Sequence, residues 1–323
     1  MKMQRIGILS SGGDAPGINP CIRAAVRTAL YHGLEVLGIE EGFEGLIHGD
    51  MRSLRARDVS GIMQQGGTFL RTARCLEFKE SKIQRKGLRE LNEREIDGLL
   101  VIGGDGSMRG AHALAALGFP VMGAPSSIDN DILGTDMSMG VDTALNTIMD
   151  SIDKLRDTAS SHQRVFLVET MGRNCGYLAL ISGVIGGAEL IMIPERDLKM
   201  ETIVAEIEGA YARGKTHAII VAAEGASLKV NDVASFLKEH EVGFEPRVTI
   251  LGHVIRGGSP SAFDRMLGTR MGVRAVEGLL DGKTDVMVGL QGRKIEYVPL
   301  ENVIATPRQP NMDYYDMAEM LAR

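Results

Sequence analysis

The sequence predicts a soluble α/β protein whose sheets are mainly parallel and covered by helices on both faces. Short runs of consecutive apolar residues are typical of strands that are buried on both sides in parallel sheets. These runs alternate with helical patterns along the whole chain, which is the element order of α/β proteins. The length of 323 residues indicates about two domains and is sufficient for substantial hydrophobic cores.

Individual strands and helices can be placed from local patterns. The predicted buried strands are residues 6–9, 99–102, 165–168, 219–221 and 248–251. A helix with one apolar stripe is predicted where apolar residues recur at steps of four and three, at Val141, Leu145, Ile148, Ile152 and Leu155. Another helix is predicted to begin with Asn19 as its N-cap and Pro20 at the first helical position.

Composition excludes several classes of function. Lysine and arginine number 36 against 42 acidic residues, a net charge of −6, so no general affinity for nucleic acid or an anionic membrane is expected. Aromatic residues are only 4% and tryptophan is absent, which argues against base-stacking platforms. Cys21, Cys75 and Cys175 are far apart and show no zinc spacing or disulfide framework, so we expect a cytoplasmic protein. Neither a secretory signal nor a transmembrane helix is expected.

Glycine is enriched, with 40 of 323 residues, about 12% against a usual ~7%. After the first predicted strand, residues 10–17 contain Gly12, Gly13 and Gly17 and lead into a helix. Glycines allow close backbone approach to an anion, and the helix start supplies free N–H groups. Ile18 and Asn19 replace the Lys-Ser/Thr pair of a P-loop, which excludes a Walker-type site. Taken alone, this loop is equally well explained as a plain turn.

A second glycine loop follows the strand at 99–102 and spans residues 103–107. Arg109 stands where a dinucleotide fingerprint requires its third glycine. Asp105, among the glycines, can reach a metal ion bound to phosphate oxygens. Two such loops at two strand ends, one of them with a carboxylate, favour a nucleotide phosphate with Mg²⁺.

Residues 125–131 contain an Asp-x-Asp pair, Asp129 and Asp131. One carboxylate can deprotonate a hydroxyl while the other orients it or holds metal. Segments rich in Ser, Asp and Asn also form ordinary turns, which is the simpler interpretation of an isolated match.

Cationic residues follow or precede the strands in matching places: Arg71, Arg74, Arg164, Arg173, His253 and Arg256. Each of them alone is typical of a solvated surface charge. Together with the glycine loops and the acidic pair, they predict phosphoryl transfer between two phosphorylated ligands.

The motifs at residues 12–17, 103–107, 128–131, 171–173 and 251–258 jointly resemble those of the 6-phosphofructokinase family, with the bacterial ATP-dependent enzymes as the nearest match. The resemblance runs from Ile6 to the end of the chain and is weakest after about residue 280. The loop at 103–107 alone is less specific, since NAD kinases and lipid kinases resemble it there. The family implies two similar three-layer domains. Residues 1–138 plus 257–302 form the larger, ATP-binding domain. Residues 139–256 plus 303–323 form the smaller domain, which binds fructose 6-phosphate.

The resemblance also implies the roles of individual residues. Asp129 is the base that takes the proton from the sugar 1-hydroxyl, and Arg74 and Arg173 stabilise the transferring phosphoryl group. ATP is held by Gly13, Arg74, Cys75, Gly103, Gly104, Asp105, Gly106 and Ser107, with Asp105 on Mg²⁺. Fructose 6-phosphate is bound by Ser127, Asp129, Asp131, Met171, Gly172, Arg173, Glu224, His253 and Arg256. Arg164 and Arg247 reach its phosphate from a neighbouring subunit, which implies a homotetramer.

The phosphoryl donor follows from two positions at which the family's pyrophosphate enzymes carry bulky Asp and Lys. In this chain the two positions are Gly106 and Ser126, whose small side chains leave room for the α-phosphate of ATP. The resemblance therefore implies an ATP-dependent phosphofructokinase, which catalyses the committed step of glycolysis. Phe43 stands where a tyrosine often flanks adenine. The alternatives are a pyrophosphate-dependent enzyme, a kinase of another sugar phosphate, or a non-catalytic sensor of nucleotide or sugar phosphate. The acidic pair with Arg173 argues against the sensor, because binding alone needs no base.

Regulation is predicted less directly. Arg23 and Arg27 lie one helical turn apart, an unfavourable like-charge pair unless an anion binds between them, and a solvated basic face is the simpler interpretation. The resemblance implies an effector site for ADP or phosphoenolpyruvate formed by Arg23, Arg27, Arg156, Glu189, Arg213 and Lys215. Ala56 occupies a position where an effector-binding arginine is expected.

Overall fold

The computed structural model describes residues 3–322, which divide into two compact units. The first unit comprises the chain up to Ile128, Ile132–Thr143 and Arg256–Arg308. The second comprises Asp129–Asp131, Ala144–Ile255 and the chain from Gln309 onward. The predicted ligand of each domain and the predicted domain limits stay predictions.

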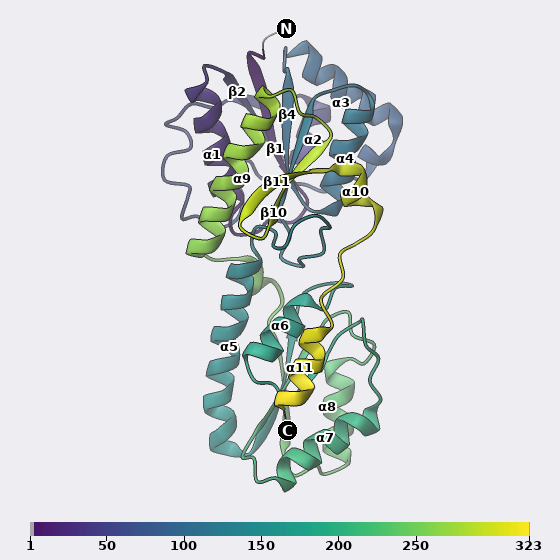
Figure 1. Cartoon of the computed structure of the whole chain (residues 1–323). Coiled ribbons are helices and arrows are strands. Elements are labelled where there is room, and N and C mark those ends of the chain that lie inside the picture. Colours follow the sequence, from purple (N-terminus) through teal and green to yellow (C-terminus); the bar gives the residue numbers. More distant parts are fainter. Residues whose placement is uncertain (1–2, 323) are drawn as a thin grey trace. The chain divides into compact units, whose positions relative to one another are not determined.

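The first unit is built on a seven-stranded sheet of order β11-β10-β5-β4-β1-β2-β3 (Figure 1). Its strands are β1 (Arg5–Ser11), β2 (Glu35–Ile39), β3 (Met51–Ser53), β4 (Gly98–Gly103), β5 (Val121–Pro125), β10 (Val286–Gln291) and β11 (Lys294–Pro299). The pairs β2–β3 and β10–β11 are antiparallel, and all other pairs are parallel. Strands β4 and β5 are buried along their whole length, as their apolar runs predict.

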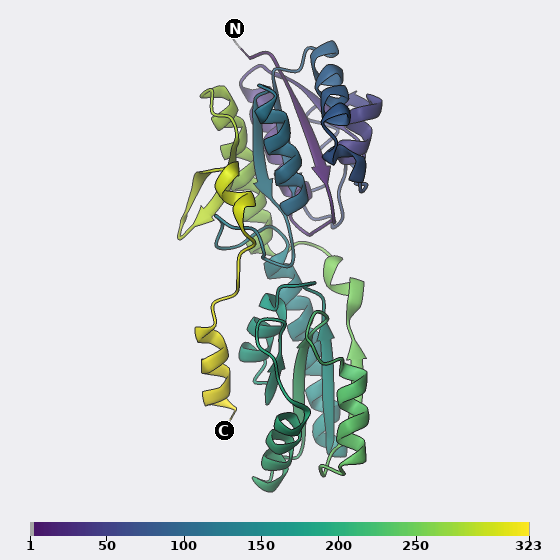
Figure 2. The same cartoon turned by 90° about the vertical axis from the view of Figure 1, so that its right-hand side faces the viewer.

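Helices cover both faces of this sheet: α1 (Ile18–Tyr31), α2 (Gly42–His48), α3 (Ser81–Glu93), α4 (Asp105–Ala116), α9 (Ala262–Leu280) and α10 (Leu300–Ala305), with a 3-10 turn η1 (Leu76–Lys79). Helices α1 and α9 pack side by side (Figures 1 and 2), because Gly268 and Gly272 let α9 approach the α1 backbone at Cys21. The other face is covered by α2, α3, α4 and α10, whose Leu46, Leu91, Leu114 and Val303 share one core with the sheet.

The second unit contains a four-stranded parallel sheet of order β7-β8-β6-β9. Its strands are β6 (Arg164–Thr170), β7 (Leu190–Met192), β8 (Ala218–Ala223) and β9 (Glu245–Ile250). Around it lie α5 (Val141–His162), α6 (Tyr177–Ile185), α7 (Met200–Ala212), α8 (Val230–Glu239), α11 (Asp313–Leu321) and a 3-10 turn η2 (Gly252–Arg256). Helices α7 and α8 share the core of one face, which contains Ile203 and Val233. On α11, the Tyr315 hydroxyl donates to the carbonyl of Ile191 at 3.1 Å.

The predicted α/β class, the apolar stripe of α5 and the buried strands at 6–9, 99–102, 165–168 and 219–221 are confirmed. The strand predicted at 248–251 exists as β9, but its burial is wrong, because β9 is an edge strand in which Ile250 is 55% exposed. The predicted N-cap at Asn19 is wrong: α1 begins at Ile18, after Gly17 with φ +117°. Asn19 lies in the first turn, and its side chain bonds to another loop instead. Its Nδ2 donates to the carbonyls of Gln65 (3.0 Å) and Gly66 (3.2 Å), and its Oδ1 accepts from the amide of Phe69 at 2.6 Å. The glycine turn therefore starts the helix, and the asparagine is used for tertiary contacts.

Two expectations from composition can also be compared with the structure. No helix within residues 3–322 is long and apolar enough to cross a membrane. Cys21, Cys75 and Cys175 are all free thiols. The prediction that there is no secretory signal concerns the first residues of the chain, of which Met1 and Lys2 lie outside the described residues.

Candidate active site

The first glycine loop connects β1 to α1 and is packed directly against an arginine from a distant part of the sequence. Gly12 has φ +90°, a conformation that favours glycine. A Cβ atom on Gly13 would lie 2.5 Å from Nη1 of Arg256, and the same nitrogen donates to the carbonyl of Asp14 at 3.3 Å. The structure therefore brings two predicted site residues, Gly13 and Arg256, into contact.

The second glycine loop lies beside the first, because β1 and β4 are parallel neighbours with Ser11 opposite Gly103. The Ser107 hydroxyl donates to the carbonyl of Ser11 at 2.9 Å and joins the two loops. A side chain at Gly103 would collide with that carbonyl and with Ser107. Helix α4 begins at Asp105, so the N–H groups of its first turn face the same sheet edge. N–H groups at a helix start are well placed to bind phosphate oxygens, so this edge fits the prediction of a phosphate site.

Asp105 is the predicted Mg²⁺ ligand. Its carboxylate is 42% exposed, and its Oδ2 accepts from Nε of Arg109 at 2.9 Å. Residues 3–322 contain no group of three or more His, Cys, Asp or Glu side chains that could hold a metal ion by themselves. Mg²⁺ commonly binds through one or two carboxylates together with substrate phosphates, and one exposed carboxylate at the phosphate-binding edge fits that mode.

The region predicted to hold the nucleoside contains Arg74 and Cys75, which precede η1. Arg74 is exposed, and Cys75 is half-buried against the core, where burial raises the pKa of its thiol to about 11. Phe43 is only 4% exposed and stacks on Phe78 with ring centroids 4.2 Å apart. The expectation that Phe43 offers a ring face to adenine is therefore wrong, because the ring is used in the core. Leu76, which is 72% exposed, is the apolar side chain that solvent reaches here.

The two positions used to infer the donor are also resolved. A Cβ atom on Gly106 would meet nothing within 4 Å, so the space beside the loop is open. Ser126 is buried, and its hydroxyl has no hydrogen-bond partner among the described residues.

In the second unit a buried carboxylate lies beside an exposed guanidinium. The Asp129 side chain is 5% exposed, and its Oδ2 lies 3.9 Å from Nε of Arg173, whose side chain is 59% exposed. Arg173 follows β6 and has φ +51°, and the preceding Gly172 has φ +144°. A carboxylate in this setting can accept a proton from a hydroxyl, while the arginine neutralises negative charge beside it.

Glu224 holds the loop that carries Arg173. Its Oε1 accepts the backbone N–H of Arg173 at 2.8 Å and that of Gly172 at 3.2 Å. Gly225 lies against the carbonyl of Arg173, where a larger residue would collide. Burial, with Glu224 nearby, raises the pKa of Glu169. The structure thus gives Glu224 contacts with the loop backbone, which sequence reasoning did not foresee.

Of the other predicted sugar-phosphate residues, Ser127 and Arg256 belong to the first unit, and four more lie elsewhere in the second unit. His253 is exposed in η2, and Met171 is buried at the end of β6. Arg164 is the first residue of β6, and Arg173 follows the last one. The two ends of a seven-residue strand are about 20 Å apart. Arg164 and Arg247 both form ion pairs with Glu245 on the edge strand β9. One chain therefore does not bring Arg164 and Arg173 to the same phosphate.

The predicted effector residues of the second unit gather around Glu189. Lys215 Nζ lies 3.0 Å from Glu189 Oε1, and Glu189 Oε2 accepts the N–H of Ile219 at 2.5 Å. Arg156 donates to the carbonyls of Gly186 and Gly187 and lies 3.2 Å from Nε2 of His217. Arg213 is exposed after α7. Burial and the charge of Arg156 lower the pKa of His217, a residue that sequence reasoning missed.

In the first unit, the predicted effector residues Arg23 and Arg27 lie one turn apart on α1. Arg27 is exposed and Arg23 is half-buried. Ala56 is exposed in the segment after β3.

Sequence reasoning also missed Asp264, a fully buried carboxylate in the first turn of α9. Its Oδ1 accepts the N–H of Gly140 at 2.9 Å, and its Oδ2 accepts the N–H (2.8 Å) and hydroxyl (2.6 Å) of Thr143. Burial raises its pKa. The signal that could have found it is the capping pattern Ser261-x-x-Asp264, since the Ser261 hydroxyl accepts the N–H of Asp264 at 3.2 Å.

These features define an α/β protein with two joined glycine loops at the carboxyl edge of one sheet and, in the second unit, a buried carboxylate beside an arginine. A family model described as phosphofructokinase matches residues 5–279, and the chain belongs to this family. The predicted resemblance and fold are thus confirmed.

Relatives match along almost the whole chain. An ATP-dependent 6-phosphofructokinase of Thermotoga neapolitana is 50% identical, and one of Natranaerobius thermophilus is 48% identical; each match covers 99% of this chain and 100% of the relative. Among solved structures, Pichia pastoris phosphofructokinase superposes with a TM-score of 0.90 at 35% identity over 94% of this chain, which spans 36% of that longer chain. A pyrophosphate-dependent phosphofructokinase of Marinobacter aquaeolei shares the fold, with a TM-score of 0.88 at 19% identity over 99% of this chain and 92% of its own.

Proposed function

We propose that this chain is an ATP-dependent 6-phosphofructokinase, which transfers the γ-phosphoryl group of ATP to the 1-hydroxyl of fructose 6-phosphate. The observation that carries the proposal is the buried Asp129 carboxylate, 3.9 Å from the guanidinium of Arg173, on a loop that Glu224 holds in place. Relatives named for this activity, at 48–50% identity over 99% of the chain, support it.

The residues act mainly by positioning and by neutralising charge. Asp129 accepts the proton of the attacking hydroxyl, and Arg173 and Arg74 stabilise negative charge on the transferring group. The two joined glycine loops bind the nucleotide phosphates through backbone N–H groups, with Gly13, Cys75, Gly104 and Ser107 among their predicted contacts. Asp105 would hold Mg²⁺, which neutralises phosphate charge when bound.

Sugar phosphate binding is assigned to Ser127, Asp131, Met171, Gly172, Glu224, His253 and Arg256, together with Arg164 and Arg247 of a neighbouring subunit. The placement of Arg164 and Arg173 at opposite ends of β6 supports sharing between subunits, and hence the homotetramer. The cluster around Glu189 supports a regulatory anion site for ADP or phosphoenolpyruvate. The free thiols support a cytoplasmic location.

The experiment is a coupled assay of fructose 1,6-bisphosphate formation with ATP or with pyrophosphate as donor. The open space at Gly106 predicts turnover with ATP and little with pyrophosphate. Turnover with pyrophosphate alone would refute the donor assignment, and turnover with neither donor would leave the sensor or another sugar phosphate as the better interpretation.

The base is tested separately. Asp129→Asn keeps the shape of the side chain but cannot take the proton, so kcat should fall by about 10²–10⁴-fold while both substrates still bind. Asp136→Asn, a change of the same kind at an exposed carboxylate outside the proposed site, is the matched control. Activity of the Asp129 variant within a few-fold of the control would show that another group is the base.

A further inference from the structure

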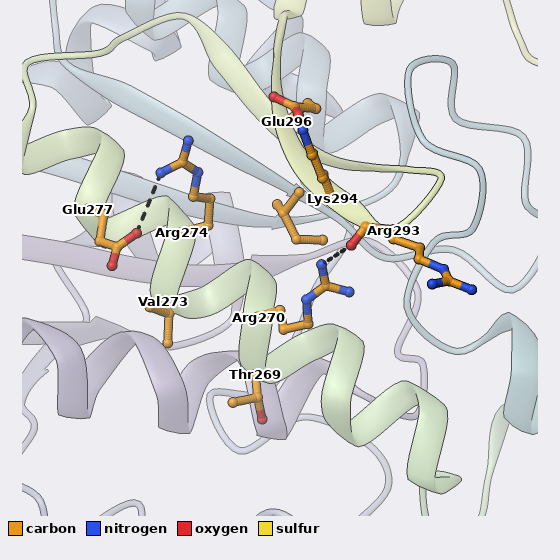
Figure 3. A pocket seen from close by; sticks show the side chains of 9 residues that line it. Thr269, Arg270, Val273, Arg274, Glu277, Arg293, Lys294 and Glu296 are labelled. Carbon is orange, nitrogen blue, oxygen red and sulfur yellow. Dashed lines mark hydrogen bonds and ion pairs between the residues drawn. The ribbon is translucent and has the colours of Figure 1, made fainter.

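A groove that the proposed reaction does not use lies in the first unit, between α9 and the hairpin of β10 and β11 (Figure 3). Its volume is about 480 Å³, which is typical of sites for small molecules. It is lined by Thr269, Arg270, Val273, Arg274 and Glu277 of α9 and by Arg293, Lys294, Ile295 and Glu296 of the hairpin. None of these residues belongs to the two glycine loops.

The groove carries an excess of positive charge, with four cationic side chains against two carboxylates. Arg270 and Arg274 are one helical turn apart, a spacing at which like charges repel unless an anion binds between them. Arg274 Nη1 lies 3.6 Å from Glu277 Oε2. Within residues 3–322, no ion pair is described for Arg270, Arg293 or Lys294. Three of the four cations of the groove therefore have no described ion pair with the protein itself.

Two of the guanidinium groups are held in place by the hairpin. Arg270 Nη2 donates to the carbonyl of Arg293 at 2.5 Å, and the guanidinium of Arg274 lies 4.3 Å from the centre of the Tyr297 ring. The Tyr297 hydroxyl in turn donates to the carbonyl of Arg274 at 3.0 Å. A guanidinium has five N–H donors, and these contacts use only some of them. Figure 3 shows Arg270 pointing toward the hairpin, while the Arg293 side chain points outward.

We propose that this groove binds a small phosphorylated molecule that carries at least two negative charges. Arginine is well suited to phosphate, because its planar donors pair with two oxygens at once. Arg270, Arg274 and Lys294 supply the charge, and the half-buried Val273 and Ile295 supply apolar surface for the rest of the molecule. None of the residues that line it is a predicted effector residue, so it offers this chain a second place for regulation by a metabolite.

The test uses the full-length protein and inorganic pyrophosphate as the probe, without Mg²⁺. Hydrogen–deuterium exchange reports on each backbone segment, so binding here is distinguished from binding at the glycine loops. Pyrophosphate should slow exchange in residues 269–277 and 291–296, whereas chloride at the same ionic strength should not. The readout needs no turnover and is independent of the proposed function.

Two variants and a control complete the design. Arg270→Gln with Arg274→Gln removes the helix cations, and Arg293→Gln with Lys294→Gln removes exposed charges of the hairpin turn that the fold does not use. Each should weaken the pyrophosphate effect at least about tenfold in concentration, since the loss of one charge-assisted hydrogen bond is sufficient for that factor. The control, Arg85→Gln with Arg89→Gln, removes two exposed cations one turn apart on α3 and should respond as the parent does.

The proposal is overturned by either of two results. The first is that pyrophosphate at about 10 mM leaves exchange in both segments unchanged, a concentration at which a site with a Kd of about 1 mM would be roughly 90% occupied. The second is that both groove variants respond like the control, or that chloride reproduces the effect, which would indicate ionic screening only.

Discussion

The buried Asp264 provides a sharp test of how the first unit is held together. Its carboxylate accepts three hydrogen bonds, from the N–H of Gly140 and from the N–H and hydroxyl of Thr143, at 2.6–2.9 Å. These residues lie at the start of α5, and the preceding Ser138 donates to the carbonyl of Ser127 at 2.6 Å. One side chain of α9 thus fixes the segment that runs beside the proposed sugar-phosphate residues.

Asp264→Asn keeps the size of the side chain but turns one acceptor into a donor. The new amide N–H must face either the N–H of Gly140 or the N–H of Thr143, so at least one buried donor loses its partner. A hydrogen bond to a charged group contributes about 1.5–3 kcal/mol, and an unpaired buried polar group costs about 1–3 kcal/mol. Relief of the cost of burying the charge offsets part of this loss, so we expect unfolding to become easier by about 2–4 kcal/mol.

The assay is unfolding in urea. Unfolding is followed by the fluorescence of an added dye, because the chain has no tryptophan, and by hydrogen exchange in residues 126–143. Thr143→Val, which removes only the hydroxyl, is the matched partner for a double-mutant cycle. Because both changes remove the same contact, the double variant should cost less than the sum of the single variants. A cost below about 0.5 kcal/mol for Asp264→Asn, or strict additivity with Thr143→Val, would refute the reasoning.

Three further predictions concern other parts of the chain. Gly103→Ala should abolish measurable ATP binding, because a methyl group there collides with backbone. Gly106→Ala, whose methyl group meets no protein atom, should weaken ATP binding only partly by narrowing the space predicted for the α-phosphate, and equal binding by both variants would contradict the loop assignment. The pKa of His217 is lowered from 6.5, so the unfolded chain binds its proton more readily, and stability should fall as pH drops below 6.5 and level off below the folded pKa. His217→Asn should reduce this dependence in melting curves between about pH 5 and 7.5, the range in which histidine changes its charge. An unchanged profile would be evidence against this role of His217. Glu245→Gln should lower the half-saturation concentration of fructose 6-phosphate by no more than about fivefold at low salt, because it removes one negative charge beside Arg164 and Arg247. Glu245→Asp is the control. A rise in the half-saturation concentration for Glu245→Gln would show that Glu245 positions the two arginines instead.

Local sequence patterns were sufficient to place five strands, α5 and the two glycine loops, whereas β2, β3, β5, β7, β10 and β11 were not predicted. A run of apolar residues that ends in glycines predicts a buried strand followed by a tight loop, because both the apolar pattern and the backbone freedom of glycine are visible within a few residues. The family resemblance rests on these two loops jointly with the motifs at 128–131, 171–173 and 251–258, all of which are short segments that can be recognised without the fold.

Other features depend on residues that are far apart in the sequence. Asn19 is a residue type that favours N-caps, but its side chain bonds to the backbone of residues 65–69. The Phe43 ring could in principle stack on a base, but it packs on Phe78. The contact of Gly13 with Arg256 and the hold of Glu224 on Arg173 likewise join distant segments. Such contacts exist only when strand order places the loops together.

The sequence by itself therefore determined the fold class, the two glycine loops and the family, since each follows from short-range patterns of residues. Only the tertiary structure decided which side chains face each other: Asp129 and Arg173, Asp264 and Thr143, and the cations between α9 and the hairpin. The physical reason is that a side chain's partners and its burial are set by packing of the sheets and helices, which local spacing does not encode.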